Sequence, residues 1–235
     1  GGRPMVCAVV DACLEAGCER VIVVVGYKQE LVREALAGFG DSVEFAVQDE
    51  QLGTGHAVRC AEPAYDGIIA SGEPHDVFVL AGDGPLIRPA TLEAMIERHH
   101  ATDAAATLAT SVIDDPTGYG RIVRDVEGRF CRIVEQKNAS DEELKIREVN
   151  PSYYCFRARE LFGALARVKR NELSGEYYVT DVPELLLGSC ERVEVLDAVP
   201  PEDVLSINTT DQLAEVDRIY RSRRANSQHT EGAAS

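Results

Sequence analysis

Apolar residues in the first half of the chain alternate between short β-branched runs and stretches with helical spacing. Residues 20–26 (RVIVVVG) form a run that is typical of a strand buried on both faces, and residues 4–16 repeat apolar positions as an amphipathic helix does. The same patterns predict helices at Lys28–Leu36, Gly55–Glu62 and Pro89–His100, and strands at Val43–Gln48, Asp76–Ala81 and Ala104–Val112. Alternation with such short connections predicts an α/β fold with a doubly wound, mostly parallel sheet.

The second half of the chain changes character. Two short apolar runs, Arg121–Arg124 and Phe130–Val134, flank the residues DVEG at 125–128 and predict a hairpin. Further strands are expected at Val149–Phe156 and Arg192–Leu196, and further helices at Ala158–Arg167, Asp181–Leu187 and Thr210–Arg223. We find no internal repeat and no second domain boundary. The sequence therefore predicts one domain over residues 1–225, followed by a small, polar and disordered tail at 226–235.

Charge narrows the classes of partner. The formal net charge of −16 argues against a nucleic-acid partner, because the carboxylates would repel phosphates over most of the surface. A small phosphorylated ligand and a divalent metal remain compatible with it. No apolar run reaches the roughly 18–20 residues that span a bilayer, and no secretory signal opens the chain, so we expect a cytoplasmic protein without a membrane partner. The seven scattered cysteines are expected to be free thiols.

Two loops at the ends of predicted strands carry candidate chemistry. Residues 48–57 (QDEQLGTGHA) include glycines that permit a close backbone approach, amides that can hydrogen-bond a base, and Thr54 as a helix N-cap. Residues 81–86 (AGDGPL) place Asp83 beyond a strand end, where open α/β sheets collect ligands and where a carboxylate offers a hard oxygen to Mg²⁺. Taken alone, the second loop is also compatible with an ordinary strand-end turn, and the first is a weak glycine-rich loop.

Polar residues at later strand ends suit a sugar. Residues 114–122 (DDPTGYGRI) form a glycine-rich loop around a tyrosine, and Glu135 and Asn150 place a carboxylate and an amide at strand ends. Both groups can hydrogen-bond a sugar hydroxyl or an N-acetyl group. A bulged loop is the simpler interpretation of residues 114–122 when they are taken alone.

Together, and in this order, the motifs resemble the uridyltransferase half of the bifunctional N-acetylglucosamine-1-phosphate uridyltransferase/glucosamine-1-phosphate acetyltransferase family. The resemblance extends over residues 2–220, nearly the whole chain. The matching strings are EQLGTGHA at 50–57, GDxPL at 82–86, DDPTGYGRI at 114–122, IVExK at 133–137, GEYYxTD at 175–181 and IN at 207–208. The strings DPTGYGR and GEYYxTD make the resemblance specific within the wider class of nucleotidyltransferases.

The resemblance implies a Rossmann-like nucleotidyltransferase fold and a reaction. UTP and N-acetylglucosamine 1-phosphate would give pyrophosphate and UDP-N-acetylglucosamine, a cell-envelope precursor, with Mg²⁺ as cofactor. By position, the residues that would hold the nucleotide are Gln48, Gly53, Thr54 and Gly82. Asp83 and Asn208 would be the catalytic metal ligands, and the sugar would contact Gly120, Glu135 and Asn150. A homo-oligomer is compatible with the resemblance.

The chain also departs from the family pattern. Family members begin with a strand leading into LxAGxGTRM and a later PK pair, whereas this chain begins at GGRPM. We therefore expect the first strand and the phosphate loop to be missing, which would leave neighbouring strands unpaired and remove cations around the triphosphate. Pro151 and Ser152 stand where the family has TG, so the sugar-side geometry is open. The chain has no hexapeptide-repeat half, and acetyl transfer is not expected.

Three functions remain open from the sequence. The first is the uridylyl transfer that the family performs. The second is a nucleotide-sugar-binding protein without turnover, and the third is a pyrophosphorylase for glucose 1-phosphate or another hexose 1-phosphate. His56 is expected to hold the glycine loop or the start of the helix rather than to act as a base.

Overall fold

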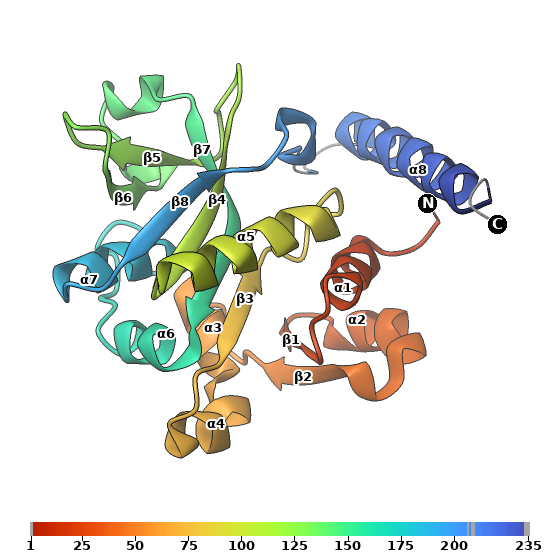
Figure 1. Cartoon of the computed structure of the whole chain (residues 1–235), viewed down its shortest axis with the longest axis horizontal. Coiled ribbons are helices and arrows are strands. Elements are labelled where there is room, and N and C mark those ends of the chain that lie inside the picture. The colour runs from red at the N-terminus through yellow and green to blue at the C-terminus, as the bar shows by residue number, and fades with distance from the viewer. Residues whose placement is uncertain (1, 206, 208–209, 233–235) are drawn as a thin grey trace.

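The computed structural model describes residues 2–205, 207 and 210–232, with side chains as far as Arg223. The α-helices are α1 (Met5–Glu15), α2 (Gln29–Leu36), α3 (Thr54–Cys60), α4 (Asp66–Ser71), α5 (Pro89–Thr102), α6 (Ala158–Leu165), α7 (Val182–Gly188) and α8 (Thr210–Gly232). The strands are β1 (Val21–Val25), β2 (Val43–Val47), β3 (Asp76–Leu80), β4 (Ala106–Val112), β5 (Gly120–Arg124), β6 (Phe130–Val134), β7 (Glu148–Arg157) and β8 (Val193–Asp197). Figure 1 shows their arrangement, which confirms the α/β class.

Strand β7 organises the larger sheet, a six-stranded one that also holds β3, β4, β5, β6 and β8. Along one edge β7 pairs with β4, and along the other it pairs first with β5 and then with β3. The change of partner from β5 to β3 falls at Pro151 and Ser152, between the two registers. This central strand therefore connects the loop after β3 with the hairpin of β5 and β6.

The expectation of a mostly parallel sheet was wrong. Among the described strands, β1–β2 and β4–β8 pair in parallel, whereas β7 is antiparallel to β3, β4 and β5, and β5 is antiparallel to β6. The reason lies in the connections, because parallel neighbours need a long crossover that is usually helical. Between β4 and β7 the chain has only the predicted hairpin and two 3₁₀ turns. It therefore returns antiparallel, while β8 follows two helices and runs parallel to β4.

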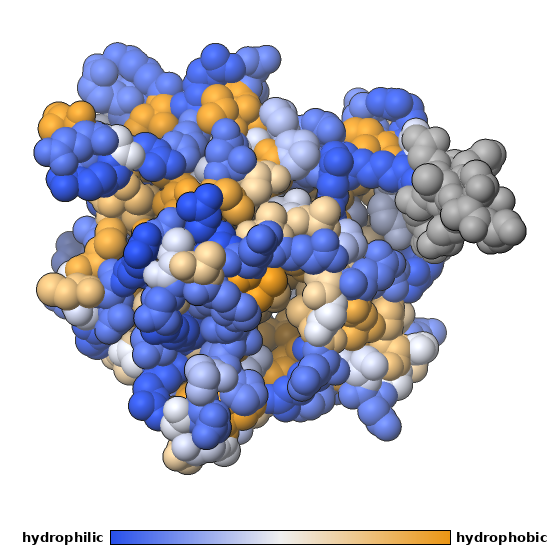
Figure 2. Space-filling view, in the orientation of Figure 1, coloured by the Kyte–Doolittle hydropathy of each residue, from blue (hydrophilic) through white to orange (hydrophobic). Residues whose placement is uncertain are grey.

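Strands β1 and β2 form a separate two-stranded parallel sheet. Helix α1 joins this unit to the larger sheet, since Val9 and Cys13 pack into the core around α5 and β7 while Cys7 and Val10 pack against α2 and β2. Among the described strands, β1 pairs only with β2, and β3 pairs only with β7. Figure 2 shows the surface hollowed between β3 and this unit, with apolar residues in the hollow. The smaller sheet and the larger sheet are therefore separate in the structure.

Most predicted elements agree with the structure to within a few residues, with two exceptions. Helix α4 was not predicted, because it is short. It ends at Gly72, whose backbone is left-handed. Helix α8 continues to Gly232, whereas a disordered tail was expected from residue 226. No proline or glycine interrupts the sequence between Thr210 and Gly232, so nothing local ends the helix earlier. None of the described helices is long and apolar enough to cross a membrane.

Candidate functional site

The glycine loop before α3 is held by a segment more than a hundred residues away. The Gly55 amide donates to the Tyr177 carbonyl at 2.8 Å, and the Tyr177 amide donates to the Leu52 carbonyl at 2.8 Å. Gly53 has φ +97°, and a Cβ there would lie 2.6 Å from the Tyr177 carbonyl oxygen. Glycine is therefore required at position 53 both for its backbone conformation and for space. The close approach that we predicted for a ligand is made, in the structure, by the backbone of Tyr177.

Thr54 takes part in the same contact. Its Oγ1 accepts a hydrogen bond from the Val179 amide at 3.1 Å. The predicted N-cap role was wrong, because Gly53 occupies the cap position and Thr54 is the first residue of α3. Since the Thr54 side chain already has a distant backbone partner, it does not need to turn back onto its own helix. A hydroxyl can still accept a second hydrogen bond from a ligand.

Gln48 and His56 hold the glycine loop from within. The Gln48 Nε2 donates to the Gly53 carbonyl at 3.1 Å and lies 3.0 Å from His56 Nδ1. An amide NH₂ can only donate, so His56 accepts through Nδ1 in this arrangement. The prediction that His56 holds the loop is confirmed. The Gln48 amide nitrogen is occupied in the loop, and its side-chain oxygen accepts no hydrogen bond from the described residues.

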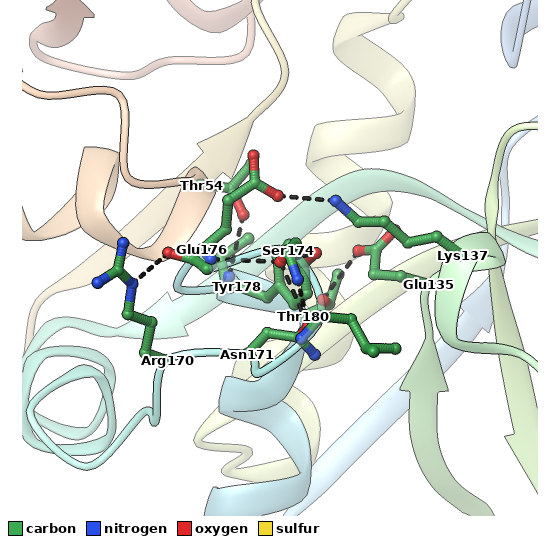
Figure 3. A network of polar contacts seen from close by, with 12 residues as sticks. Thr54, Glu135, Lys137, Arg170, Asn171, Ser174, Glu176, Tyr178 and Thr180 are labelled. Atoms are coloured by element: carbon green, nitrogen blue, oxygen red, sulfur yellow. Dashed lines mark hydrogen bonds and ion pairs between the residues drawn. The ribbon is translucent and has the colours of Figure 1, made fainter.

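Residues 175–181 form a bridging segment between the glycine loop, where the nucleotide was predicted to bind, and Glu135, a predicted sugar residue (Figure 3). On one side they contact the glycine loop, as described above. On the other, the Thr180 Oγ1 donates to Glu135 Oε1 at 2.9 Å, and Lys137 forms an ion pair with Glu176 at 2.8 Å. The sequence of this segment is recognisable as a family string, but it does not by itself indicate a role. Its function as a bridge was missed because the partners are distant in sequence and pair largely through the backbone.

The bridge is itself well ordered by local hydrogen bonds. Asn171 Oδ1 accepts from the amides of Leu173 and Ser174, both at 3.0 Å, which is an Asx-type turn. The Tyr178 hydroxyl donates to Ser174 Oγ at 2.6 Å. Figure 3 shows these side chains packed beneath the ion pair of Lys137 and Glu176. These local hydrogen bonds therefore fix the conformation of the segment that contacts both the glycine loop and Glu135.

The two carboxylates Glu176 and Asp181 of the bridging segment lie in different electrostatic environments. The hydrogen bond to Lys137 lowers the pKa of the Glu176 carboxyl, and the same contact raises the pKa of Lys137. Asp181 is different. Burial raises the pKa of its carboxyl to about 6, and the negative charges of Glu184 and Glu135 add to the effect. This carboxyl therefore titrates near neutral pH at the edge of the predicted sugar site.

The predicted sugar residues Gly120 and Asn150 lie opposite each other, paired in register between β5 and β7. A Cβ on Gly120 would lie 3.0 Å from Ile133 Cγ2, so a larger residue would crowd the sheet. Asn150 is buried; its Nδ2 donates to the Tyr154 hydroxyl at 2.5 Å and its Oδ1 accepts the Ser152 amide at 3.2 Å. One N–H and one lone pair of the amide remain for a ligand.

Ser152, which stands where the family pattern has glycine, has an unusual backbone conformation. Its φ of +64° lies in the left-handed region, where glycine is unstrained and a serine is not. The strand changes partner at this residue, and the Asn150 side chain accepts its amide. The serine thus adopts a backbone conformation that favours glycine, the residue that the family pattern has at this position.

The predicted metal loop is the connection between β3 and α5, residues 81–88. Gly82 and Asp83 are exposed, and Asp83 forms no ion pair or hydrogen bond within the described part of the chain. Asn208 lies outside the described residues. No group of three His, Cys, Asp or Glu residues among those described could hold a metal by itself. This donor set fits Mg²⁺, which commonly takes one or two protein ligands and completes its shell with phosphates and water.

Comparison with known proteins settles the family. Residues 1–178 match the MobA-like NTP transferase domain family. The chain belongs to this family. The match includes the glycine loop, the metal loop and the sugar-side strands, and it ends within the bridging segment. Members of the MobA-like NTP transferase domain family are nucleotidyltransferases, so the predicted enzyme class is confirmed.

Curated relatives confirm the resemblance drawn from the motifs. The bifunctional protein GlmU of Geobacter metallireducens is 44% identical over 222 residues, which cover 94% of this chain and 45% of that protein. GlmU of Syntrophomonas wolfei is 42% identical over 224 residues, covering 95% and 48%. The chain thus spans about half the length of these curated relatives. The crystal structure of apo UDP-glucose pyrophosphorylase aligns with a TM-score of 0.69 at 17% identity, covering 94% of this chain and 88% of that one, which supports the fold.

Proposed function

We propose that this nucleotidyltransferase transfers a uridylyl group from UTP to N-acetylglucosamine 1-phosphate. The products are UDP-N-acetylglucosamine and pyrophosphate. A phosphate oxygen of the sugar phosphate attacks the α-phosphorus of UTP, and the bond from that phosphorus to the pyrophosphate oxygen breaks. Relatives named bifunctional protein GlmU, 42–44% identical over nearly the whole chain, support the assignment. A cytoplasmic location belongs to the same proposal.

One observation carries the proposal beyond the family. The bridging segment 175–181 contacts the glycine loop through Tyr177 and Val179, and it contacts Glu135 through Thr180. A ligand with a base at one end and a sugar at the other would need both regions fixed relative to each other. Catalysis of phosphoryl transfer depends mostly on such positioning, because the protein forms no covalent bond itself.

Each predicted residue has a role in this proposal. Gln48, Gly53, Thr54 and Gly82 hold the nucleotide, and Gly120, Glu135 and Asn150 hold the sugar ring and its acetamide. Asp83 and Asn208 would hold Mg²⁺, which neutralises charge between the phosphates when it is bound. Glu135 accepts only one hydrogen bond from Thr180 among the described residues, so its second oxygen is available to a sugar hydroxyl.

The test is pyrophosphate release from UTP and Mg²⁺ with a panel of sugar 1-phosphates, run beside equilibrium binding of UDP-N-acetylglucosamine. We expect release with N-acetylglucosamine 1-phosphate in preference to glucose 1-phosphate. Binding without release would identify a protein that binds the nucleotide-sugar without turning it over. Release with a preference for glucose 1-phosphate would replace the proposed sugar.

Two variants assign the effect to the site. Asp83→Asn removes the exposed carboxylate, and we expect the rate to fall by about 100-fold or more. Asn150→Ala should reduce the preference for the N-acetyl sugar more than it reduces the affinity for UTP. If Asn150→Ala leaves that preference unchanged, the sugar-site assignment is wrong. Asp66→Asn, on the exposed start of α4, is a matched carboxylate control that should leave the rate unchanged.

A further inference from the structure

Asp203 is an unusual residue in this chain. Its side chain is only 1% exposed, and among the residues whose side chains are described it is the only buried carboxylate. It ends a short 3₁₀ turn after β8, Pro201–Asp203. A buried carboxylate is unfavourable unless it is paired and hydrogen-bonded, so its partners indicate why it is there.

Two arginines from distant parts of the chain converge on this carboxylate. Arg88, at the N-terminus of α5, binds it in a forked manner, through Nε to one oxygen and through Nη2 to the other at 3.1 Å. Arg223, the last residue of α8 whose side chain the structure describes, donates through Nη2 to the same group. Fork-shaped pairs of this kind fix both distance and orientation. Asp203 therefore joins α5 and α8 to the turn after β8.

Both arginines also lead to the loop that carries Asp83. Arg88 ends that loop, and Arg223 Nη1 donates to the carbonyl of Leu86 within it at 3.1 Å. Beneath the loop, the buried Tyr153 hydroxyl lies 3.2 Å from where a Cβ on Gly84 would be. The loop is thus packed from below by β7 and tied from the side by the arginines.

The cluster is close to electrically neutral. Arg88 Nη2 also donates to Glu202 at 3.0 Å, and Arg223 lies 3.9 Å from the same carboxylate. Among the side chains that the structure describes, two guanidinium groups therefore meet two carboxylates beside the metal loop. Because their charges balance, the cluster can hold the loop without attracting phosphate or repelling a divalent cation. Asp83 itself takes no part in these pairs and stays exposed.

We propose that Asp203 is a positioning residue for the metal loop: by holding Arg88 and Arg223, it fixes residues 81–88 and so the direction of the Asp83 carboxylate. The link to metal binding rests on the proposed function, in which Asp83 is a Mg²⁺ ligand. The link to the loop does not, because it follows from the contacts of the ligand-free protein. The two parts can therefore be tested separately.

The first test is hydrogen exchange of the ligand-free protein, comparing Asp203→Asn with Asp76→Asn. Asp76 is a matched control, because it is also paired, with His99 and His100, but lies at the opposite end of β3 from the loop. The amide of Ile87 donates to the Gly84 carbonyl at 3.3 Å and reports on the loop. We expect its exchange to become about tenfold faster in Asp203→Asn and unchanged in Asp76→Asn. Unchanged exchange in a folded Asp203→Asn protein would overturn the proposal.

The second test is Mg²⁺ binding to protein saturated with UDP-N-acetylglucosamine. Partners behind a metal ligand typically contribute about 10-fold or more to metal affinity, and we expect a loss of that size in Asp203→Asn. Metal-free affinity for the nucleotide-sugar should stay within about twofold, and Asp203→Glu should recover part of the metal affinity. An equal loss of both affinities would mean that Asp203 is only structural and would overturn the proposal.

Two outcomes need separate interpretation. If Asp203→Asn does not fold, Arg223→Lys replaces it, because lysine keeps the charge but lacks the fork that reaches both Asp203 and Leu86. We expect the same changes in smaller measure, and their absence would overturn the proposal. If the unaltered protein binds no Mg²⁺ in the complex, the proposed function fails, while loop exchange still decides whether Asp203 holds the loop.

Discussion

The two sheets of this protein differ in how they are supported. The larger sheet surrounds β7, which has partners along both edges and lies between clusters of fully buried residues. Among the described strands, the smaller sheet contains β1 and β2, joined by five register pairs and covered by α1 and α2. Two strands alone are marginally stable in water. We therefore expect amide exchange to be faster in β1 and β2 than in β4 and β7.

The difference matters because the candidate site uses both sheets. The glycine loop follows β2 of the smaller sheet, whereas Gly120 and Asn150 lie in the larger sheet and Glu135 directly follows its strand β6. The bridging segment 175–181 binds the glycine loop through backbone hydrogen bonds and binds Glu135, next to the larger sheet, through the Thr180 side chain. The less stable sheet thus presents a loop that the more stable sheet keeps in place. Substitutions at Gly53, Asp181, Ser152 and Lys137 test this division of roles.

Breaking the bridge at Gly53 should have the largest effect. In Gly53→Ala the new Cβ would lie 2.6 Å from the Tyr177 carbonyl, at a residue with φ +97°. We expect a loss of about 3 kcal/mol in the free energy of unfolding, since strain and a backbone clash act together. Urea denaturation measures it. Gly163→Ala is the matched control, because its Cβ meets nothing within 4 Å inside α6 and should be neutral or stabilising. Equal destabilisation of the two variants would contradict the close contact.

Asp181 should make stability depend on pH. Its folded pKa of about 6 lies above the ordinary value of 3.8, so the folded protein keeps a proton that the unfolded chain releases. Stability should therefore fall as pH rises from about 4 to 6. Asp181→Asn should be more stable than the unaltered protein by about 1 kcal/mol at pH 7–8, after solvent screening is allowed for.

The measurement for Asp181 is denaturation of both proteins between pH 3.5 and 8, values chosen to bracket the expected titration at about 4–6. The two curves should converge below about pH 4, where the carboxyl is protonated in both states. A constant difference at all pH values would show that Asp181 acts through packing and not through its charge.

Ser152→Gly should stabilise the larger sheet without touching the smaller one. The serine has φ +64°, and relief of that strain outweighs the added flexibility of the unfolded chain by about 0.5–1 kcal/mol. Calorimetry detects the shift in Tm. Hydrogen exchange should slow in β7 and remain as it was in β1 and β2. A matching change in β1 and β2 would show that the two sheets unfold as one unit.

The ion pair of Lys137 and Glu176 should contribute least. Both side chains are more than one third exposed, so Lys137→Met should cost less than about 1 kcal/mol, and added salt should reduce the difference further. Thermal denaturation at two salt concentrations is the measurement. A loss as large as that of Gly53→Ala would mean that side-chain charge, and not the backbone, fixes the bridge.

Sequence patterns predicted most elements of this fold because their apolar periodicities are local. They did not predict the direction of β7, which depends on the absence of an α-helix between β4 and β7 rather than on any property of the strand itself. Similarly, the strings at 50–57 and 175–181 were each recognisable, but nothing in either string indicates that Gly55 bonds to Tyr177. The Asp203 cluster was missed for the same reason, since its arginines lie 115 and 20 residues from it.

Hydrogen exchange of the whole protein, with and without UDP-N-acetylglucosamine and Mg²⁺, shows whether the bridging segment joins the two sheets into one ligand site. If one ligand spans a site that the bridging segment joins, protection should rise together in residues 48–56, 133–137 and 175–181. The largest gain should fall in residues 48–56, since the smaller sheet starts from the lower stability. Protection confined to one of the three segments, or absent from all of them, would contradict the account.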